Sequence, residues 1–150
     1  MDGVVSATKP VFSWEDPFFL DQQLEDDERM VRDSARQFAR DVLLPRVISD
    51  FREESFDPAV MRQMGELGLL GPTIPAEYGG AGVNHIAYGL AAYEIEAIDS
   101  GYRSAMSVQS SLVMHPIHAF GTEDQKKRFL PRLATCLLYT SPSPRDNPAS

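Results

Sequence analysis

The stretch LEDDERMVRDSARQFARDVLLPRVISDF, residues 24–51, has the most regular spacing of apolar residues in this chain of 150 residues. Its apolar positions recur at intervals of four, three and four residues, at Val31, Ala35, Phe38 and Val42. That period places them on one face of an amphipathic α-helix, with arginine and aspartate residues between them. The stretch therefore predicts a long surface helix. We expect Pro45 to kink or end it, because proline removes a backbone donor and clashes with the preceding turn.

A second helix is predicted just downstream. Asp57 is a good N-cap, and Pro58 suits the first helical position, where a missing N–H is no loss. Gly68 or Gly71 is expected to end this helix. Residues 69–74 then predict an extended, buried connection. The apolar positions of the helix itself are Val60, Met61, Met64 and Leu67.

Three further helices are predicted in the second half of the chain. The first covers about 84–98, and its apolar face is expected to contain Ile86, Leu90, Tyr93 or Glu94, and Ala97. The second covers about 101–119 and has a small, weakly polar middle. The third begins at Thr122, because Thr122 and Gln125 have the spacing of a capping box. With five helices and no convincing strand, the sequence predicts an all-α helical bundle.

Composition limits the classes of function. The chain is 43% hydrophobic and carries one cysteine, which indicates one globular domain without a disulfide. A net charge of −8 argues against nucleic acid as a partner, because phosphate binding needs clustered Lys and Arg. The one basic run is Lys126-Lys127-Arg128. No apolar run could span a bilayer, and residues 1–14 lack the pattern of a leader, so we expect a cytoplasmic protein without membrane contact.

The chain divides into three parts by composition. Residues 1–14 predict a flexible N-terminus, residues 15–135 a helical domain, and residues 136–150 a disordered tail. The last part includes TSPSPRDNPAS, residues 140–150, with three prolines and three serines. We expect this tail to be foreign to the rest, as after a frameshift or a misassembled junction; a natural truncation is the alternative.

Three candidate sites are weak. His115 and His118 are three residues apart on a predicted helix, but a metal site needs further ligands. The glycine-dense loop 77–82 lacks the lysine and the strand context of a phosphate-binding loop, and a tight turn with positive φ explains it better. Cys136 has no neighbouring base that would make it a nucleophile. We therefore predict no metal site and no nucleophilic cysteine.

Arg103 is the stronger candidate. On a helix, Arg103 and Ser107 lie one turn apart, and Ser104 lies beside them. A guanidinium flanked by hydroxyls in a lightly charged stretch suits the binding of a buried carboxylate by two parallel hydrogen bonds. On spacing alone, a structural ion pair is the favoured alternative, with Asp99 or with a glutamate such as Glu94 or Glu96.

Two groups of motifs carry a resemblance to a known family. PAEYGGAG, residues 75–82, followed by AYGL, residues 87–90, resembles the amino-terminal helical domain of acyl-CoA dehydrogenases. MGELGLLGPTI, residues 64–74, and DSGYRSAMSVQSSLVMHPI, residues 99–117, more narrowly resemble the glutaryl-CoA dehydrogenases of that family. The resemblance covers about residues 12–135.

The resemblance implies an FAD enzyme that converts glutaryl-CoA to crotonyl-CoA and CO2 in lysine and tryptophan catabolism, with electron-transfer flavoprotein as partner and a homotetramer as the complete assembly. Arg103 and Ser104 match the family's Arg-Ser pair beside the distal carboxylate of the substrate, and Ser107 matches a further hydroxyl near it. These three are the predicted substrate-binding residues. A buried carboxylate needs such a cation, whereas a simple fatty acyl chain does not.

The family's FAD site and catalytic glutamate belong to domains that this chain does not contain. We therefore expect no catalytic, cofactor-binding or metal-binding residue here, and no activity from the chain alone. A domain without its packing partners is expected to be marginally stable or to self-associate. Two alternatives remain open: another short- or branched-chain acyl-CoA dehydrogenase, and a catalytically silent helical interaction module.

Overall fold

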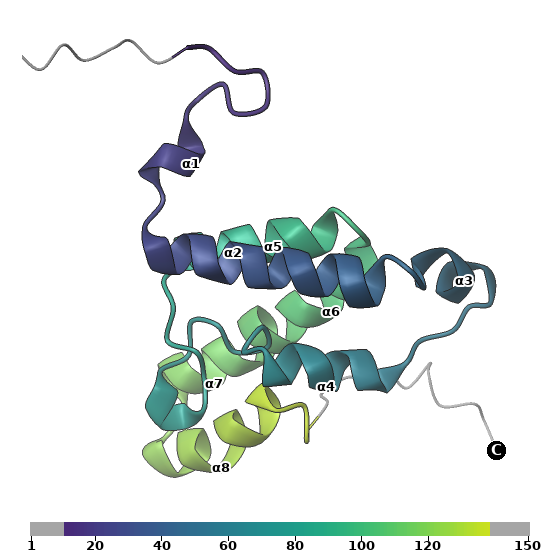
Figure 1. Cartoon of the computed structure of the whole chain (residues 1–150). Helices are drawn as coiled ribbons and strands as arrows, with labels where there is room; N and C mark the ends of the chain where they lie inside the picture. The colour runs from purple at the N-terminus through teal and green to yellow at the C-terminus, as the bar shows by residue number, and fades with distance from the viewer. Residues whose placement is uncertain (1–10, 139–150) are drawn as a thin grey trace, which may run out of the picture.

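The computed structural model describes residues 11–138, and these residues form helices and turns without a strand (Figure 1). This confirms the predicted all-α class. Within the same residues, no helix is both long enough and apolar enough to cross a bilayer. The elements are α1 (Leu20–Gln23), α2 (Asp26–Phe38), the π-helical η1 (Ala39–Leu43), α3 (Val47–Arg52), α4 (Pro58–Glu66), the 3-10 turn η2 (Ala76–Tyr78), α5 (His85–Glu96), α6 (Ser100–Ser107), the π-helical η3 (Val108–Met114), α7 (His115–Phe120) and α8 (Glu123–Ala134).

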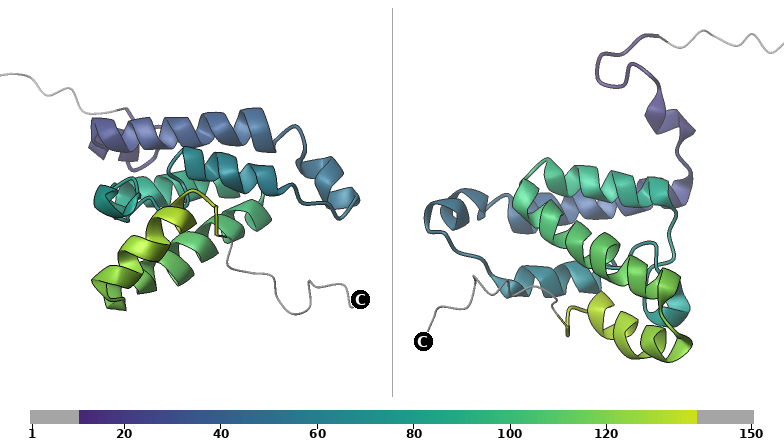
Figure 2. Two further views of the ribbon diagram at one scale, coloured as in Figure 1. Left: turned by 90° about the horizontal axis from the view of Figure 1, so that it is seen from below. Right: turned by 180° about the vertical axis from the view of Figure 1, so that it is seen from behind.

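The helices form a layered bundle. α2 and α5 lie side by side, and α6, η3 and α7 follow one another as a continuous rod beneath them (Figures 1 and 2). α8 returns along α7 at the far end of the bundle from α2. α4 lies between these two ends (Figure 1). The rod therefore connects the α2–α5 pair to the α7–α8 pair.

The first predicted helix is built from three elements. α2 continues into η1, in which the N–H of Leu44 donates to the carbonyl of Ala39 at 2.9 Å, a π-type bond five residues back. The chain then turns at residues 44–46 and restarts as α3. Pro45 was expected to kink or end the helix, and the structure shows that the helix ends there. The π-helical turn keeps Ala39 and Leu43 both buried.

Local capping signals are confirmed. The Asp57 carboxylate accepts from the N–H of Ala59 at 2.8 Å at the start of α4. Thr122 and Gln125 form the predicted capping box of α8, with bonds of 2.8 and 3.3 Å. Gly68 has φ +74 and follows α4, which is the glycine ending predicted there. These signals depend on residues close in sequence, so spacing alone was enough to find them.

The connection after α4 corrects one expectation. Residues 69–74 are mostly buried, as predicted, but they form turns, not an extended segment. The N–H groups of Ile74 and Ala81 both donate to the carbonyl of Gly71, at 3.2 and 3.1 Å. Because backbone groups removed from water need partners, the buried segment folds into turns that supply them. The loop that follows contains Gly79 with φ +83, the positive φ predicted for a tight turn.

The apolar face of α5 also differs from the prediction. Ile86 is 57% exposed, whereas Ala91 and Ile95 are buried; of the predicted alternatives Tyr93 and Glu94, Tyr93 is 69% exposed and Glu94 is buried. α5 is apolar on nearly all sides, so its periodicity could not select a face. The packed face carries small residues, which let α2 and α5 approach closely.

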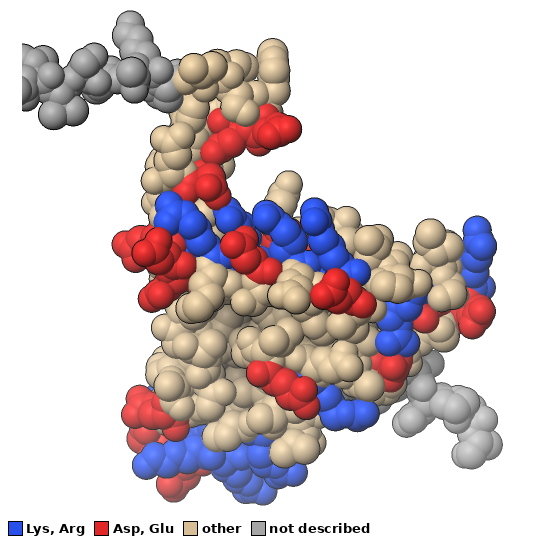
Figure 3. Space-filling model, viewed as in Figure 1, with Lys and Arg blue, Asp and Glu red and all other residues tan. Residues whose placement is uncertain are grey.

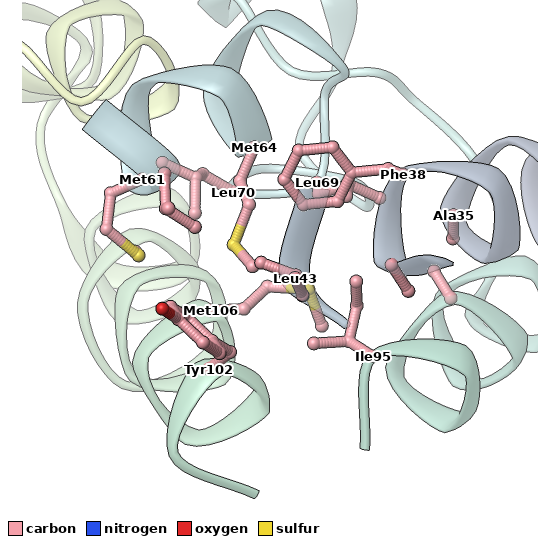
Figure 4. Close-up of a cluster of buried hydrophobic side chains, with 13 residues drawn as sticks. Ala35, Phe38, Leu43, Met61, Met64, Leu69, Leu70, Ile95, Tyr102 and Met106 are labelled. Carbon is pink, nitrogen blue, oxygen red and sulfur yellow. The ribbon is translucent and has the colours of Figure 1, made fainter. Parts of the chain in front are cut away.

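Two apolar clusters form the core. The larger one lies among α2, η1, α4, α5 and α6, and Figure 4 shows its side chains pointing toward one another. Leu43, Met64, Ile95 and Met106 within it are fully buried. The smaller cluster joins the glycine loop and η3 to α8 and contains Ile74, Tyr78, Met114, Leu130, Leu133 and Ala134. The bundle is thus stabilised at both ends of the rod.

Neighbouring leucines provide a matched test of this core. Leu43 is fully buried, and Leu44 is 52% exposed. Leu43→Ala should lower the free energy of unfolding by about 2–5 kcal/mol, because it removes buried methyl groups and leaves a cavity. Leu44→Ala should lower it by less than about 1 kcal/mol. Urea denaturation followed by circular dichroism measures both, and equal losses for the two variants would contradict this core.

Candidate functional site

Arg103 lies on α6 and makes two side-chain hydrogen bonds. Its Nε donates to Glu96 Oε2 at 2.5 Å, and its Nη1 donates to Ser107 Oγ at 3.2 Å. The side chains of Arg103 and Glu96 are 35% and 42% exposed, so the pair lies at the surface. The structure therefore confirms that Arg103 and Ser107 share one helix face. Within the chain, Arg103 pairs with the half-exposed carboxylate of Glu96 and not with a buried one.

Ser104 completes the predicted group. Its carbonyl accepts from Ser107 Oγ at 3.2 Å, which holds the Ser107 side chain over the helix backbone. Within residues 11–138, the Ser104 hydroxyl has no hydrogen-bond partner, and it is partly exposed. The three predicted residues thus lie together on consecutive turns of α6, with one hydroxyl engaged by Arg103 and one available.

The other two carboxylates proposed as partners of Arg103, Glu94 and Asp99, have other partners in the structure. Glu94 is occupied by Arg36, whose Nε and Nη2 donate to its two oxygens at 3.0 and 2.8 Å. Asp99 is the N-cap of α6 and accepts from the N–H of Tyr102 at 3.0 Å. Of the three carboxylates considered from sequence, Glu96 is the one that pairs with Arg103. The ion pair that spacing favoured is present.

The ion pair does not exhaust the donors of Arg103. A guanidinium has five N–H groups, and the described residues use the Nε–H and one Nη1 hydrogen. The Nη2 amino group and the second Nη1 hydrogen have no partner within residues 11–138. A guanidinium held on one edge by Glu96 can therefore bind a second carboxylate on its other edge.

The Glu96 carboxyl is held in its charged form. The hydrogen bond from Arg103, and next the one from Ser100, lower its pKa below the ordinary value. Folding therefore gains stability from this group above the ordinary pKa, and that stability is lost as the pH falls through the lowered pKa. At neutral pH, Glu96 stays ionised and keeps Arg103 oriented.

A partly buried polar network lies next to this site, and the sequence does not predict it. The Tyr102 hydroxyl donates to Asp50 Oδ2 at 2.9 Å, and Arg46 donates to Asp50 at 2.7 Å and to Asp57 at 3.1 Å. The network joins α3, the start of α4, and α6. Its members are up to 56 residues apart in sequence, so no spacing rule could have paired them. It fixes the first turn of α6, on which Arg103 also lies.

The weak candidates have ordinary structural roles. The ring of His118 packs edge-on against Tyr78, with centroids 5.7 Å apart. Within the described residues, no group of three or more His, Cys, Asp or Glu side chains could hold a metal ion. Cys136 is a free thiol whose pKa is raised by burial. Burial thus favours its protonated, less reactive form.

The glycine loop is shaped by packing against its own chain. A Cβ on Gly80 would lie 2.0 Å from the carbonyl oxygen of Ile74, and one on Gly79 would lie 3.1 Å from the Cα of Pro131. A phosphate-binding loop uses glycine to let a ligand approach the backbone, but here the chain itself fills that space. The loop therefore does not fit the pyrophosphate of FAD.

The fold and these motifs agree with a known domain. The family model described as "Acyl-CoA dehydrogenase, N-terminal domain" matches residues 25–136. The chain belongs to the acyl-CoA dehydrogenase family, a family of oxidoreductases. The match begins one residue before α2 and continues past the end of α8.

Individual relatives differ in their substrates. A crystal structure of a glutaryl-CoA dehydrogenase from Mycobacterium smegmatis in complex with FADH2 is 43% identical, with a TM-score of 0.75 over 79% of this chain and 30% of that one. An acyl-CoA dehydrogenase of Bacillus subtilis is 35% identical over 73% of this chain and 29% of its own length. The bovine mitochondrial short-chain specific acyl-CoA dehydrogenase is 36% identical over 72% and 26%, respectively. The chain thus spans less than a third of the length of these relatives.

The Tyr102–Asp50 contact gives a titration test. Burial and the bond to the Asp50 carboxylate raise the pKa of Tyr102 to about 12, and a bond to Glu123 raises that of Tyr78 to about 12. A folded-state pKa above the ordinary value of about 10 stabilises the fold below pH 10, and this is lost as the pH rises from about 10 to 12. When tyrosinate formation is followed by absorbance, Tyr102 and Tyr78 should ionise in a late step near pH 12. Tyr102→Phe should remove half of this late step.

Tyr78→Phe is the complementary variant for this titration, because it removes the other tyrosine whose pKa is raised to about 12. It should reduce the late step as Tyr102→Phe does. A late step of equal size in the wild type and in Tyr102→Phe would show that the Tyr102–Asp50 bond does not form in solution.

Proposed function

We propose that this chain supplies the amino-terminal helical domain of an FAD-dependent acyl-CoA dehydrogenase that acts on glutaryl-CoA. The observation that carries the proposal is Arg103, which keeps unused N–H donors and is followed in sequence by Ser104, whose hydroxyl is available. The similarity to the Mycobacterium smegmatis glutaryl-CoA dehydrogenase supports the same choice of substrate.

In the proposed complex, Arg103 and Ser104 bind the distal carboxylate of the substrate, and Ser107 holds the guanidinium from the side. Glu96 fixes the Nε edge, so that the Nη edge is presented to the ligand. A carboxylate that leaves water needs such a partner, because an unpaired charge is costly in an apolar site. These residues thereby select dicarboxylic acyl groups over simple fatty acyl groups.

The chemical steps are proposed for the complete protein. Glutaryl-CoA is oxidised by two electrons and loses CO2, which gives crotonyl-CoA. Residues outside this chain hold the FAD that accepts the electrons, and electron-transfer flavoprotein receives them from the flavin. A homotetramer in the cytoplasm, or in the mitochondrial matrix of a eukaryote, is the proposed assembly and location. The chain alone binds no flavin and is inactive.

A second candidate is a short-chain acyl-CoA dehydrogenase. The bovine and mouse short-chain specific enzymes, 36% and 37% identical to this chain, favour it. In that case the Arg103–Glu96 pair is a surface ion pair that joins α5 to α6. The two candidates differ in their prediction for substitution of Arg103: the first expects a change in substrate preference, and the second expects none.

A chimeric enzyme separates the two candidates. Residues 25–136 of this chain would replace the matching segment of the Mycobacterium smegmatis glutaryl-CoA dehydrogenase. Arg103→Leu in the chimera should lower the ratio of glutaryl-CoA to butyryl-CoA turnover about ten- to a hundred-fold. This corresponds to a charge-assisted interaction of roughly 1.5–3 kcal/mol. Arg103→Lys should give an intermediate ratio, since it keeps the charge but loses the planar fork.

Arg52→Leu is the control, because Arg52 is an exposed arginine at the end of α3. It should leave the ratio unchanged. A chimera whose ratio is the same with Arg103 and with Leu at this position would rule out the glutaryl-CoA proposal and favour the short-chain one.

A further inference from the structure

Tyr102 and Arg103 are neighbours in sequence and face different parts of the bundle. Successive residues of an α-helix are about 100° apart around its axis. The Tyr102 side chain lies in the larger core cluster and is 6% exposed (Figure 4). The Arg103 side chain is 35% exposed and reaches Glu96 at the end of α5. The first turn of α6 therefore carries a buried tyrosine next to the arginine of the candidate site.

The Tyr102 hydroxyl joins α6 to two other elements. It donates to Asp50 Oδ2 at 2.9 Å, and Arg46 Nε donates to the same oxygen at 2.7 Å. Arg46 Nη1 also donates to Asp57, the N-cap of α4, at 3.1 Å. The outer members of this network reach the surface, where Figure 3 shows basic and acidic side chains close together around α3. The start of α6 is thus held against both α3 and α4.

The Asp50 carboxylate is itself held in one place. Its side chain is 16% exposed, and its Oδ1 accepts from Ser55 Oγ at 3.3 Å. The hydrogen bond from Tyr102, followed by that from Arg46, lowers the pKa of Asp50 below its ordinary value. An ionised acceptor makes a stronger hydrogen bond than a neutral one. The bond between Tyr102 and Asp50 is therefore a firm restraint on the first turn of α6.

The two side-chain bonds of Arg103 respond differently to a movement of this turn. Ser107 lies on α6 and moves with Arg103, whereas Glu96 lies on α5. A rotation of the first turn of α6 would change the separation of Arg103 Nε from Glu96 and leave the contact with Ser107 in place. The bond from Arg103 to Glu96 thus depends on the orientation of α6.

We propose that Tyr102 and Asp50 are positioning residues for Arg103. Their hydrogen bond sets the orientation of the first turn of α6, and with it the direction of the guanidinium donors that Glu96 and Ser107 leave unused. The proposal rests on the proposed binding of a substrate carboxylate by Arg103. Binding through two parallel hydrogen bonds requires the guanidinium and the carboxylate to be aligned, so a small displacement weakens it. Preference for a dicarboxylic acyl group then depends on a tyrosine buried in the core.

The pKa of the Glu96 carboxyl reports on this coupling in the chain itself. The hydrogen bond from Arg103 is the largest cause that lowers it. Tyr102→Phe removes one hydroxyl and should raise the pKa of Glu96 toward its ordinary value, because Arg103 loses its position. The rise should be at least about half of that caused by Arg103→Leu, which removes the donor altogether. A carbon NMR titration of the Glu96 carboxyl group in the 150-residue chain measures both.

Tyr78→Phe is the matched control, because it removes the same kind of bond at the far end of the bundle. Tyr78 is 7% exposed, and its hydroxyl donates to Glu123 on α8 at 2.8 Å. Tyr78→Phe and Tyr102→Phe should both lower the free energy of unfolding, but Tyr78→Phe should leave the pKa of Glu96 at its wild-type value. A Glu96 pKa that is unchanged by Tyr102→Phe, or raised equally by Tyr78→Phe, would overturn the proposal.

Asp50→Ala tests the same bond from its other end. It should raise the pKa of Glu96 as Tyr102→Phe does. The double variant should raise it no further than the larger single effect, because both substitutions remove one interaction. Circular dichroism should show that each variant keeps its helices. Effects of the two substitutions that simply add would contradict positioning through the bond between Tyr102 and Asp50.

Substrate preference separates this proposal from the proposed function. In the chimeric enzyme, Tyr102→Phe should lower the ratio of glutaryl-CoA to butyryl-CoA turnover about two- to tenfold, the range of one hydrogen bond. Tyr78→Phe should leave the ratio unchanged. A ratio changed by Arg103→Leu but not by Tyr102→Phe would refute positioning by Tyr102 and keep the glutaryl-CoA proposal. A ratio unchanged by both would refute the glutaryl-CoA proposal, and the pKa of Glu96 would still show whether Tyr102 positions Arg103.

Discussion

The parallel contact between α2 and α5 determines the arrangement of the rest of the chain. At one end, Asn84 caps α5 through the N–H of Ala87 and donates to Glu28 at 2.7 Å, and Glu28 closes the capping box of α2. At the other end, Arg36 holds both oxygens of Glu94. The contact between the helices is therefore fixed by polar groups at both ends, with small buried residues between them.

This contact also positions the candidate site. Because α5 is fixed in rotation, Glu96 in its last turn faces the start of α6 instead of the core, and there it meets Arg103. The network around Tyr102 and Asp50 fixes α6 from the other side. The guanidinium is thus oriented by contacts within the chain, as a preorganised binding group requires.

The sequence predicted features that depend on neighbours in the chain and missed those that depend on tertiary contacts. The cap at Asp57 and the box at Thr122 need only a few residues, so spacing identified them. The face of α5 could not be chosen, because Ile86 and Ala91 are both apolar and the choice depends on α2. For the same reason, spacing could not decide whether Arg103 pairs with Asp99, Glu94 or Glu96. The claim that residues 1–14 are flexible and that 136–150 form a foreign tail stays a prediction, since 1–10 and 139–150 lie outside the described residues.

In the proposed complex, Arg103, oriented by Glu96, binds the distal carboxylate of a dicarboxylic acyl-CoA. This binding can be seen in a crystal structure of the chimeric enzyme with a nonreactive analogue of glutaryl-CoA. The distal carboxylate should lie within about 3 Å, hydrogen-bond distance, of an Arg103 Nη atom and the Ser104 hydroxyl. Glu96 should remain on Nε. A distal carboxylate bound elsewhere, with Arg103 still facing solvent, would refute the proposed role of Arg103.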